Sequence, residues 1–384
     1  MSFKFWPSLK IIAYARIAQG ILYTYDLEKL KRNFPEKRRR NKKYMKEIDD
    51  TTKKISFPYL SETFKRLDAA ARRNPEGVKA VPLQPKIRRQ LRGIVLTMGL
   101  EIKKWFISHK SIMKDGKHNL RNKLSWFSFG VIDRLETARN FIHDEGWDII
   151  VRFHLACNYC FEDDLQMLWR NMTTQNRIDA ERRLPSCRNI WLWFEALHGN
   201  IPRNWEEITH NSFFSGNSMG IRSYFPNLRG PEMRCQSINC ALKTTKVHHY
   251  DLYSCISLLN SDELSSLRTG LRTPEICILL QSFLEWPFQI IFLDVVNYFE
   301  NRISQDIFEN IVTFILRTKL GSGFLDLMYI EIFKPFWNLF SAVYEDHIRQ
   351  MNYELYLLAT YILEGSNEYD GHKYRHMLNM YFSD

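Results

Sequence analysis

The chain has 384 residues, 45% of them apolar and 14% aromatic, a composition that excludes disorder for most of its length. Its 16 glycines and 13 prolines are fewer than average usage predicts, which argues against a turn-rich all-β protein and favours an all-α one. The net charge of +11 is unevenly divided: residues 1–125 contain 31 Lys and Arg against 11 Asp and Glu, and residues 126–384 contain 23 against 32. A basic front third therefore precedes a mildly acidic body.

The front third, residues 1–116, is predicted to be a basic helical region. Helical spacing of apolar residues predicts a helix over 8–25, with Ser8 as its N-cap. The stretch FPEKRRRNKKYMKEIDD, residues 34–50, is the most charged part of the chain and is expected to be exposed. After a proline-rich linker, Pro85 stands where a long basic helix should begin.

The next region, residues 117–365, is predicted to be a body of short apolar helices, with an irregular insertion at about 199–230 and a polar tail at 366–384. Two of its stretches, PEICILLQSFLEWPFQIIFLDVVNYFE and DIFENIVTFILRTKLGSGFLDLMYIEIF, both read as helix, break, helix, at an offset of about 32 residues. Such pairs bury their apolar faces only by stacking. We therefore expect stacked antiparallel helix pairs, an ankyrin-like or related α-solenoid. The helices are expected at about 129–143, 148–160, 162–172, 186–198, 231–243, 248–259, 262–269, 274–285, 287–300, 305–318, 325–340 and 351–364.

The stretch VRFHLACNYCFEDDLQMLW, residues 151–169, could hold a metal or a redox centre, because His154, Cys157 and Cys160 share one face of a helix. A thiolate zinc site needs a second pair of ligands, and a redox pair needs a strand before its helix; the sequence offers neither. The stretch resembles an ankyrin repeat instead, with Cys160 at the turn where that family has glycine. The matching positions are Phe153, His154, Ala156, Cys160, Leu165, Leu168 and Trp169.

A second resemblance covers most of the chain. The segments FPYLSETFKRLDAAARR, CNYCFEDDLQMLW and FLEWPFQIIFLDVVNYF resemble parts of an expanded family of uncharacterised arachnid helical-repeat proteins. The shared positions are apolar and aromatic, so the resemblance implies no catalytic or binding residues.

Three further motifs contain residues that could act as a nucleophile or as metal ligands. The pattern GNSMG, residues 216–220, places Ser218 where a hydrolase nucleophile would stand, but that elbow needs a strand before it and a helix after it. His372 and His376 lie one turn apart without a zincin glutamate, which favours surface histidines. His248 and His249 are adjacent, so on a helix they are expected to point in different directions.

The densest cluster of positive charge predicts a surface patch that binds nucleic acid or serves as a nuclear-import signal. It consists of Lys37, Arg38, Arg39, Arg40, Lys42 and Lys43. The long basic helix is expected to extend this patch with Arg88, Arg89, Arg92, Lys103 and Lys104. The competing interpretation is a solvated surface that keeps the protein soluble.

Two observations favour a location in the cytoplasm or nucleus. Seven cysteines in a large chain predict reduced thiols. Lys4, Lys10 and Arg16 interrupt the apolar N-terminus, and no run reaches the roughly 18 apolar residues of a membrane span. A soluble protein without a membrane partner is expected.

The sequence thus predicts a non-enzymatic protein-binding scaffold with no metal and no cofactor. The alternatives are a nucleic-acid-binding protein that uses the basic front third and a serine hydrolase that uses Ser218.

Overall fold

The computed structural model describes residues 3–25, 27, 46–48, 50, 51, 84–113, 120–183, 188–199, 211–244, 247–321, 328–365 and 370–382. Within these ranges the regular structure is helical, and the β structure there is a single bridge between Trp126 and Ile132. The predicted all-α class is confirmed. The patch Lys37, Arg38, Arg39, Arg40, Lys42 and Lys43 lies outside the described residues.

The first two long helices follow the sequence signals. Helix α1 (Leu9–Leu22) is capped by Ser8, whose Oγ accepts a hydrogen bond from the Ile11 N–H at 3.3 Å. Helix α5 (Pro85–Ser108) begins at the predicted proline. The two helices pack against each other, and small buried residues of α1, such as Ala15 and Ala18, allow a close approach.

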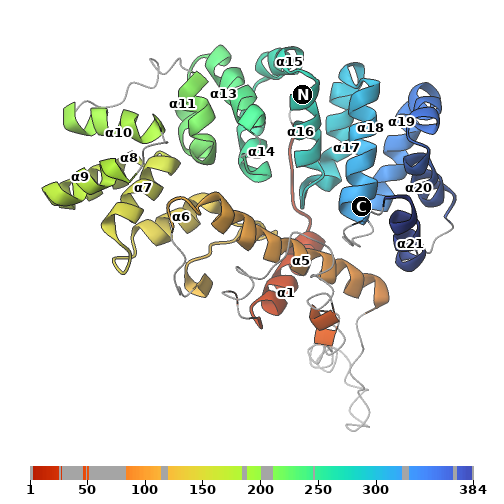
Figure 1. The fold of residues 1–384 in the computed structure, drawn as a ribbon, viewed down its shortest axis with the longest axis horizontal. Helices are drawn as coiled ribbons and strands as arrows, with labels where there is room; N and C mark the ends of the chain where they lie inside the picture. Colours follow the sequence, from red (N-terminus) through yellow and green to blue (C-terminus); the bar gives the residue numbers. More distant parts are fainter. Residues whose placement is uncertain are drawn as a thin grey trace, which may run out of the picture.

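The body follows as a succession of shorter helices. Figure 1 shows them one after another in a row, with α1 and α5 along one side of it. In chain order they are α6 (Arg134–Ile142), α7 (Ile149–Tyr159), α8 (Glu162–Asn171), α9 (Thr174–Arg182), α10 (Arg188–Gly199), α11 (Asn211–Gly216), α12 (Ile221–Tyr224), α13 (Pro231–Thr244), α14 (His249–Ser257), α15 (Ser261–Gly270), α16 (Thr273–Phe283), α17 (Phe292–Phe299), α18 (Gln305–Thr313), α19 (Met328–Met351), α20 (Tyr353–Glu364) and α21 (Gly371–Tyr381).

Short 3-10 turns and one π-helix complete the described part of the chain. The π-helix, Phe314–Leu320, continues α18 directly. The 3-10 turns are Leu120–Asn122, Ser218–Gly220, Phe225–Asn227, Phe288–Ile291 and Glu300–Arg302.

The predicted insertion and the predicted tail differ from the observed structure, α9 was not predicted, and the helix expected at 325–340 continues to Met351 as α19. The irregular insertion expected at 199–230 contains α11, α12 and two 3-10 turns in its described part, because Phe213, Phe214 and Tyr224 are buried there and order the chain. The polar tail expected at 366–384 contains α21, which buries Tyr374 and Leu378. Glycine and proline in the first segment, and charged residues in the second, favour irregular structure in a sequence-based prediction, although buried aromatic and apolar side chains order both segments.

The described helices on both sides of residue 116 contribute to one continuous hydrophobic core. The N-terminal segment runs into the body: the Phe5 N–H donates to the Tyr253 hydroxyl at 2.7 Å, and Phe3 packs edge-on against Tyr298. Among the described residues, no single helix is long and apolar enough to cross a membrane. The pair Thr273–Phe283 and Phe288–Arg302 reaches that length together, but bends by 120°.

Candidate functional site

The stretch 151–169 forms α7, a turn and α8, as its ankyrin-like pattern predicts. Cys160 ends α7 in the left-handed conformation with φ 55°, which is the turn position expected from the sequence. His154 is buried, and its Nε2 donates to the Ala180 carbonyl at 3.2 Å. Burial lowers the pKa of His154 to about 4. His154, Cys157 and Cys160 do not converge as metal ligands among the described residues.

Ser218 lies in a 3-10 turn and is 3% exposed. The helix α11 precedes this turn where a nucleophile elbow would have a strand. A Cβ added to Gly220 would lie 2.7 Å from the carbonyl oxygen of Asn158, so this glycine lets the turn pack against the end of α7. His372 and His376 are exposed on α21.

The basic residues of α5 are partly turned toward acidic groups of the body. The Lys104 Nζ lies 3.8 Å from a carboxylate oxygen of Glu285, and the Lys86 Nζ lies 3.8 Å from Glu331. The part of the expected positive face at residues 37–43 lies outside the described residues, so the continuous face stays a prediction.

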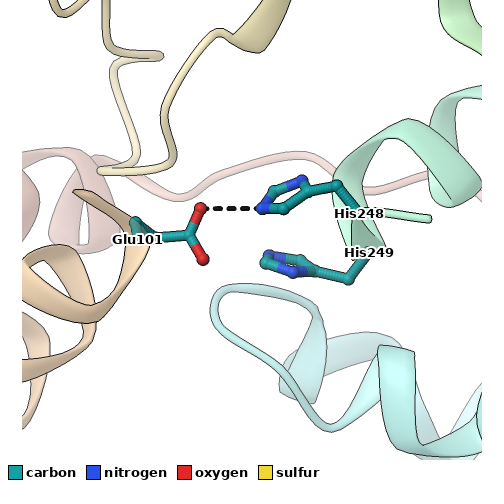
Figure 2. A group of neighbouring side chains, drawn as sticks. All are labelled: Glu101, His248 and His249. Carbon is teal, nitrogen blue, oxygen red and sulfur yellow. Dashed lines mark hydrogen bonds and ion pairs between the residues drawn. The ribbon is translucent and has the colours of Figure 1, made fainter. Parts of the chain in front are cut away.

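The structure instead brings together three residues that the sequence treated separately: Glu101, His248 and His249. Their possible ligand atoms lie within 4.8 Å of one another. Glu101 comes from the middle of α5, and the two histidines stand at the start of α14. Figure 2 shows both imidazole rings extending from α14 toward the Glu101 carboxylate.

The expectation that His248 and His249 diverge is wrong, because only one of them is inside the helix. His248 is the N-cap of α14, with φ −75° and ψ 139°, and its Nδ1 accepts a hydrogen bond from the Tyr250 N–H at 3.3 Å. His249 is the first helical residue. The change of backbone conformation between the two brings their ring centroids to 4.1 Å.

The hydrogen bonds of the cluster define its protonation. The His248 Nε2 lies 2.7 Å from Glu101 Oε2, and since its Nδ1 is an acceptor, Nε2 is the donor. The His249 Nε2 lies 2.9 Å from the Trp286 carbonyl oxygen, which only accepts, so Nε2 carries a proton there too. Its Nδ1 lone pair is left available.

Burial and neighbouring charges shift the acid–base properties of the cluster. Burial alone would raise the pKa of Glu101, but His248, His249 and Lys104 outweigh it and hold this pKa well below its usual range. Burial, reinforced by His248, lowers the pKa of His249 to about 3. The cluster therefore contains an anionic carboxylate beside a neutral imidazole at neutral pH.

A cavity of about 390 Å³ adjoins the cluster, and His248 and His249 form part of its wall. Glu285 of this wall is held by Lys319 at 2.6 Å and by Lys104; burial would raise its pKa, but Lys104 and Lys319 lower it to about 2. Lys319 belongs to the π-helix, a distortion that often marks functional positions. Arg134 and Ser108 also line the cavity, and Arg134 donates to the Ser108 Oγ at 2.9 Å.

Sequence reasoning missed this site for two reasons. Glu101 stands in a helix whose other charged residues are mostly basic, and no motif marks it as different from them, although it is only 3% exposed. The helix expected over 248–259 starts one residue too early, so it treats His248 as helical, whereas His248 is the N-cap of α14.

A second feature is an exposed apolar face on α19. Leu339 and Val343, one turn apart on this helix, are 44% and 71% exposed. The acidic residues Glu331 and Asp346 on the same helix are exposed as well. Single exposed apolar residues are ordinary, whereas exposed apolar side chains that adjoin one another are a feature of interaction surfaces.

Comparisons with models of protein families, with curated proteins and with solved structures give no match for this chain.

Proposed function

We propose that this protein is a non-enzymatic scaffold that binds a partner protein through the outer face of α19. The observation that carries this proposal is the exposed pair Leu339 and Val343. In water, such side chains contribute binding energy only when another apolar surface covers them.

The arrangement of the body supports a scaffold. Helix α13 contacts α16, α16 contacts α18, and α18 contacts α19. Successive parts of the chain thus pack on one another along the body. We propose that these contacts represent stacked antiparallel helix pairs, as in ankyrin-like arrays. Arrays of this kind present long faces to partners without any reactive group.

The partner that fits this face is an amphipathic helix with basic residues beside its apolar stripe. Leu339 and Val343 would cover the stripe. Glu331 and Asp346, which are 62% and 82% exposed, would exchange their pairs with Lys86 and Arg349 for its positive charges. Complementary charge of this kind raises association rate and selects the partner.

The test compares two variants of the full-length protein by affinity capture from native tissue. Leu339→Glu combined with Val343→Glu should reduce capture of the true partner, since losing about 2 kcal/mol of apolar burial weakens binding roughly 30-fold. Leu258→Glu is the matched control, because Leu258 is 51% exposed at the end of α14. Circular dichroism melts check that both variants remain folded.

The pattern of loss decides the outcome. A partner lost with the α19 double variant and retained with the Leu258 variant supports the proposal, and its measured affinity for a synthetic basic amphipathic helix of that partner should show the same difference. If every captured protein is retained equally by the two variants, α19 is not a binding surface.

Nucleic-acid binding and serine hydrolysis stay as the alternatives. Neutralising Lys37 to Arg40 with Lys42 and Lys43 tests the first, since binding through them should weaken steeply with salt. Labelling by a serine-directed activity probe tests the second.

A further inference from the structure

We infer that Glu101, His248 and His249 form a binding site for one divalent first-row transition-metal ion, with Zn²⁺ as the best match. This site is independent of the α19 surface and gives the protein a bound cofactor beside the partly open cavity described above.

The donor set is the first argument. Two imidazole nitrogens with one carboxylate oxygen are a recurrent three-residue ligand set for Zn²⁺, which leaves a fourth position open. Zn²⁺ binds such atoms at about 2.0–2.1 Å, so ligands in a tetrahedral shell are about 3.3 Å apart. The observed separations run from 2.7 Å between His248 and Glu101 to at most 4.8 Å. Small side-chain rotations would therefore complete the shell.

The outer hydrogen bonds are the second argument. Histidines that bind metals usually donate their other ring N–H to a carbonyl or carboxylate. His249 already does so, because its Nε2 donates to the Trp286 carbonyl, and in this tautomer Nδ1 carries the lone pair that a metal needs. This feature distinguishes the cluster from a plain Glu–His ion pair, which needs no third residue.

His248 can join at a small cost. Its Nε2 proton, now donated to Glu101, would move to Nδ1 by exchange of the neutral tautomer, so that Nε2 binds the ion. The exchange removes the 3.3 Å bond that Nδ1 accepts from the Tyr250 N–H. A helix cap of this kind is worth about 1 kcal/mol, much less than metal binding supplies.

The cavity is the third argument. Both histidines line its wall, so an ion held by them has space beside it for the fourth ligand. The side chain of Lys104 is 48% exposed and Glu285 pairs with it, so this cation can remain near solvent when a metal binds. The added positive charge favours an anionic fourth ligand, either hydroxide or a small carboxylate.

The first experiment uses the metal-free, full-length protein. Co²⁺ titration should give visible absorption bands that saturate at one ion per chain, and Zn²⁺ should displace Co²⁺. X-ray absorption on the Zn²⁺ form should show two imidazoles and no sulfur. Failure to bind one ion per chain, or sulfur in the ligand shell, overturns the proposal even if no variant is made.

Variants then assign the ligands. Glu101→Gln and His249→Gln should each weaken Zn²⁺ binding at least 10-fold, measured by competition with a chromophoric chelator. The control is His372→Ala with His376→Ala, which removes an exposed pair of histidines on α21 and should leave binding unchanged. If binding survives both cluster variants, or is lost in the control, the assignment is wrong.

Discussion

Gly220 provides the sharpest test of what the GNSMG motif does. Its φ is −93°, which any residue adopts, so a glycine is not required here for backbone conformation. A glycine is required here because the neighbouring backbone leaves no room for a Cβ atom. A Cβ at this position would lie 2.7 Å from the carbonyl oxygen of Asn158 and 3.0 Å from the carbonyl carbon of Tyr159.

The cost of Gly220→Ala follows from that contact. An ordinary contact of about 3.4 Å would need a backbone displacement of about 0.7 Å, and overpacking of this size costs about 1–3 kcal/mol. The midpoint of thermal unfolding should fall by about 1–4 °C, and hydrogen exchange should increase at the end of α7 and in the turn Ser218–Gly220.

Gly270→Ala is the matched control, since a Cβ there meets nothing within 4 Å. This change should be neutral or slightly stabilising, because alanine reduces the entropy of the unfolded chain. Equal stability of the two variants would refute the conclusion that Gly220 is a packing residue of the α7 end.

Three further predictions test buried groups. Asp251→Asn should destabilise the protein by about 3 kcal/mol, because Asp251 lies 3.6 Å from both Arg134 and Arg222 in a buried network. The control Asp346→Asn, at an exposed position, should change stability by less than about 0.5 kcal/mol. Equal denaturant midpoints for the two variants would contradict this prediction. The free energy of unfolding of Cys160→Gly should stay within about 1 kcal/mol of that of the parent protein, because the loss of backbone strain at φ 55° offsets the loss of a buried side chain. Cys160→Val should lower the free energy of unfolding by more than about 2 kcal/mol. The reverse order in urea unfolding would refute the assigned turn. The pKa of His154 is about 4 in the folded protein against 6.5 in the unfolded chain, so the unfolded chain binds a proton more readily. The contribution of His154 to the free energy of unfolding is therefore complete above pH 6.5 and falls by about 3 kcal/mol as the pH drops toward 4. His154→Gln should flatten the stability profile in that window, and an unchanged slope would exclude this residue as its source.

The sequence predicted much of the local structure because local rules decide it. Ser8 and Pro85 start helices where capping chemistry places them. Glu162, Asp163 and Asp164 occupy the first turn of α8, where acidic residues interact favourably with the positive helix end. Cys160 forms the expected turn although it is not glycine.

Other helix starts were displaced by one residue, for equally local reasons. Asn260, not Ser261, caps α15, because its Oδ1 accepts from the N–H groups of Asp262 and Glu263. Helix α16 starts at Thr273, and the Glu275 carboxylate accepts from the Arg272 N–H at 3.1 Å. Neighbouring polar residues compete for the cap, and the sequence does not rank them.

By itself, the sequence determined the all-α class, most helix positions and the helix, turn and helix around residues 151–169, since these depend on periodicity and caps within short segments. Only the tertiary structure decided that Glu101 faces His248 and His249, because 147 residues separate the carboxylate from its imidazole partner. No local pattern encodes such a distance. It arises when α5 packs on the body and removes a carboxylate from water, so that burial forces it to find a partner.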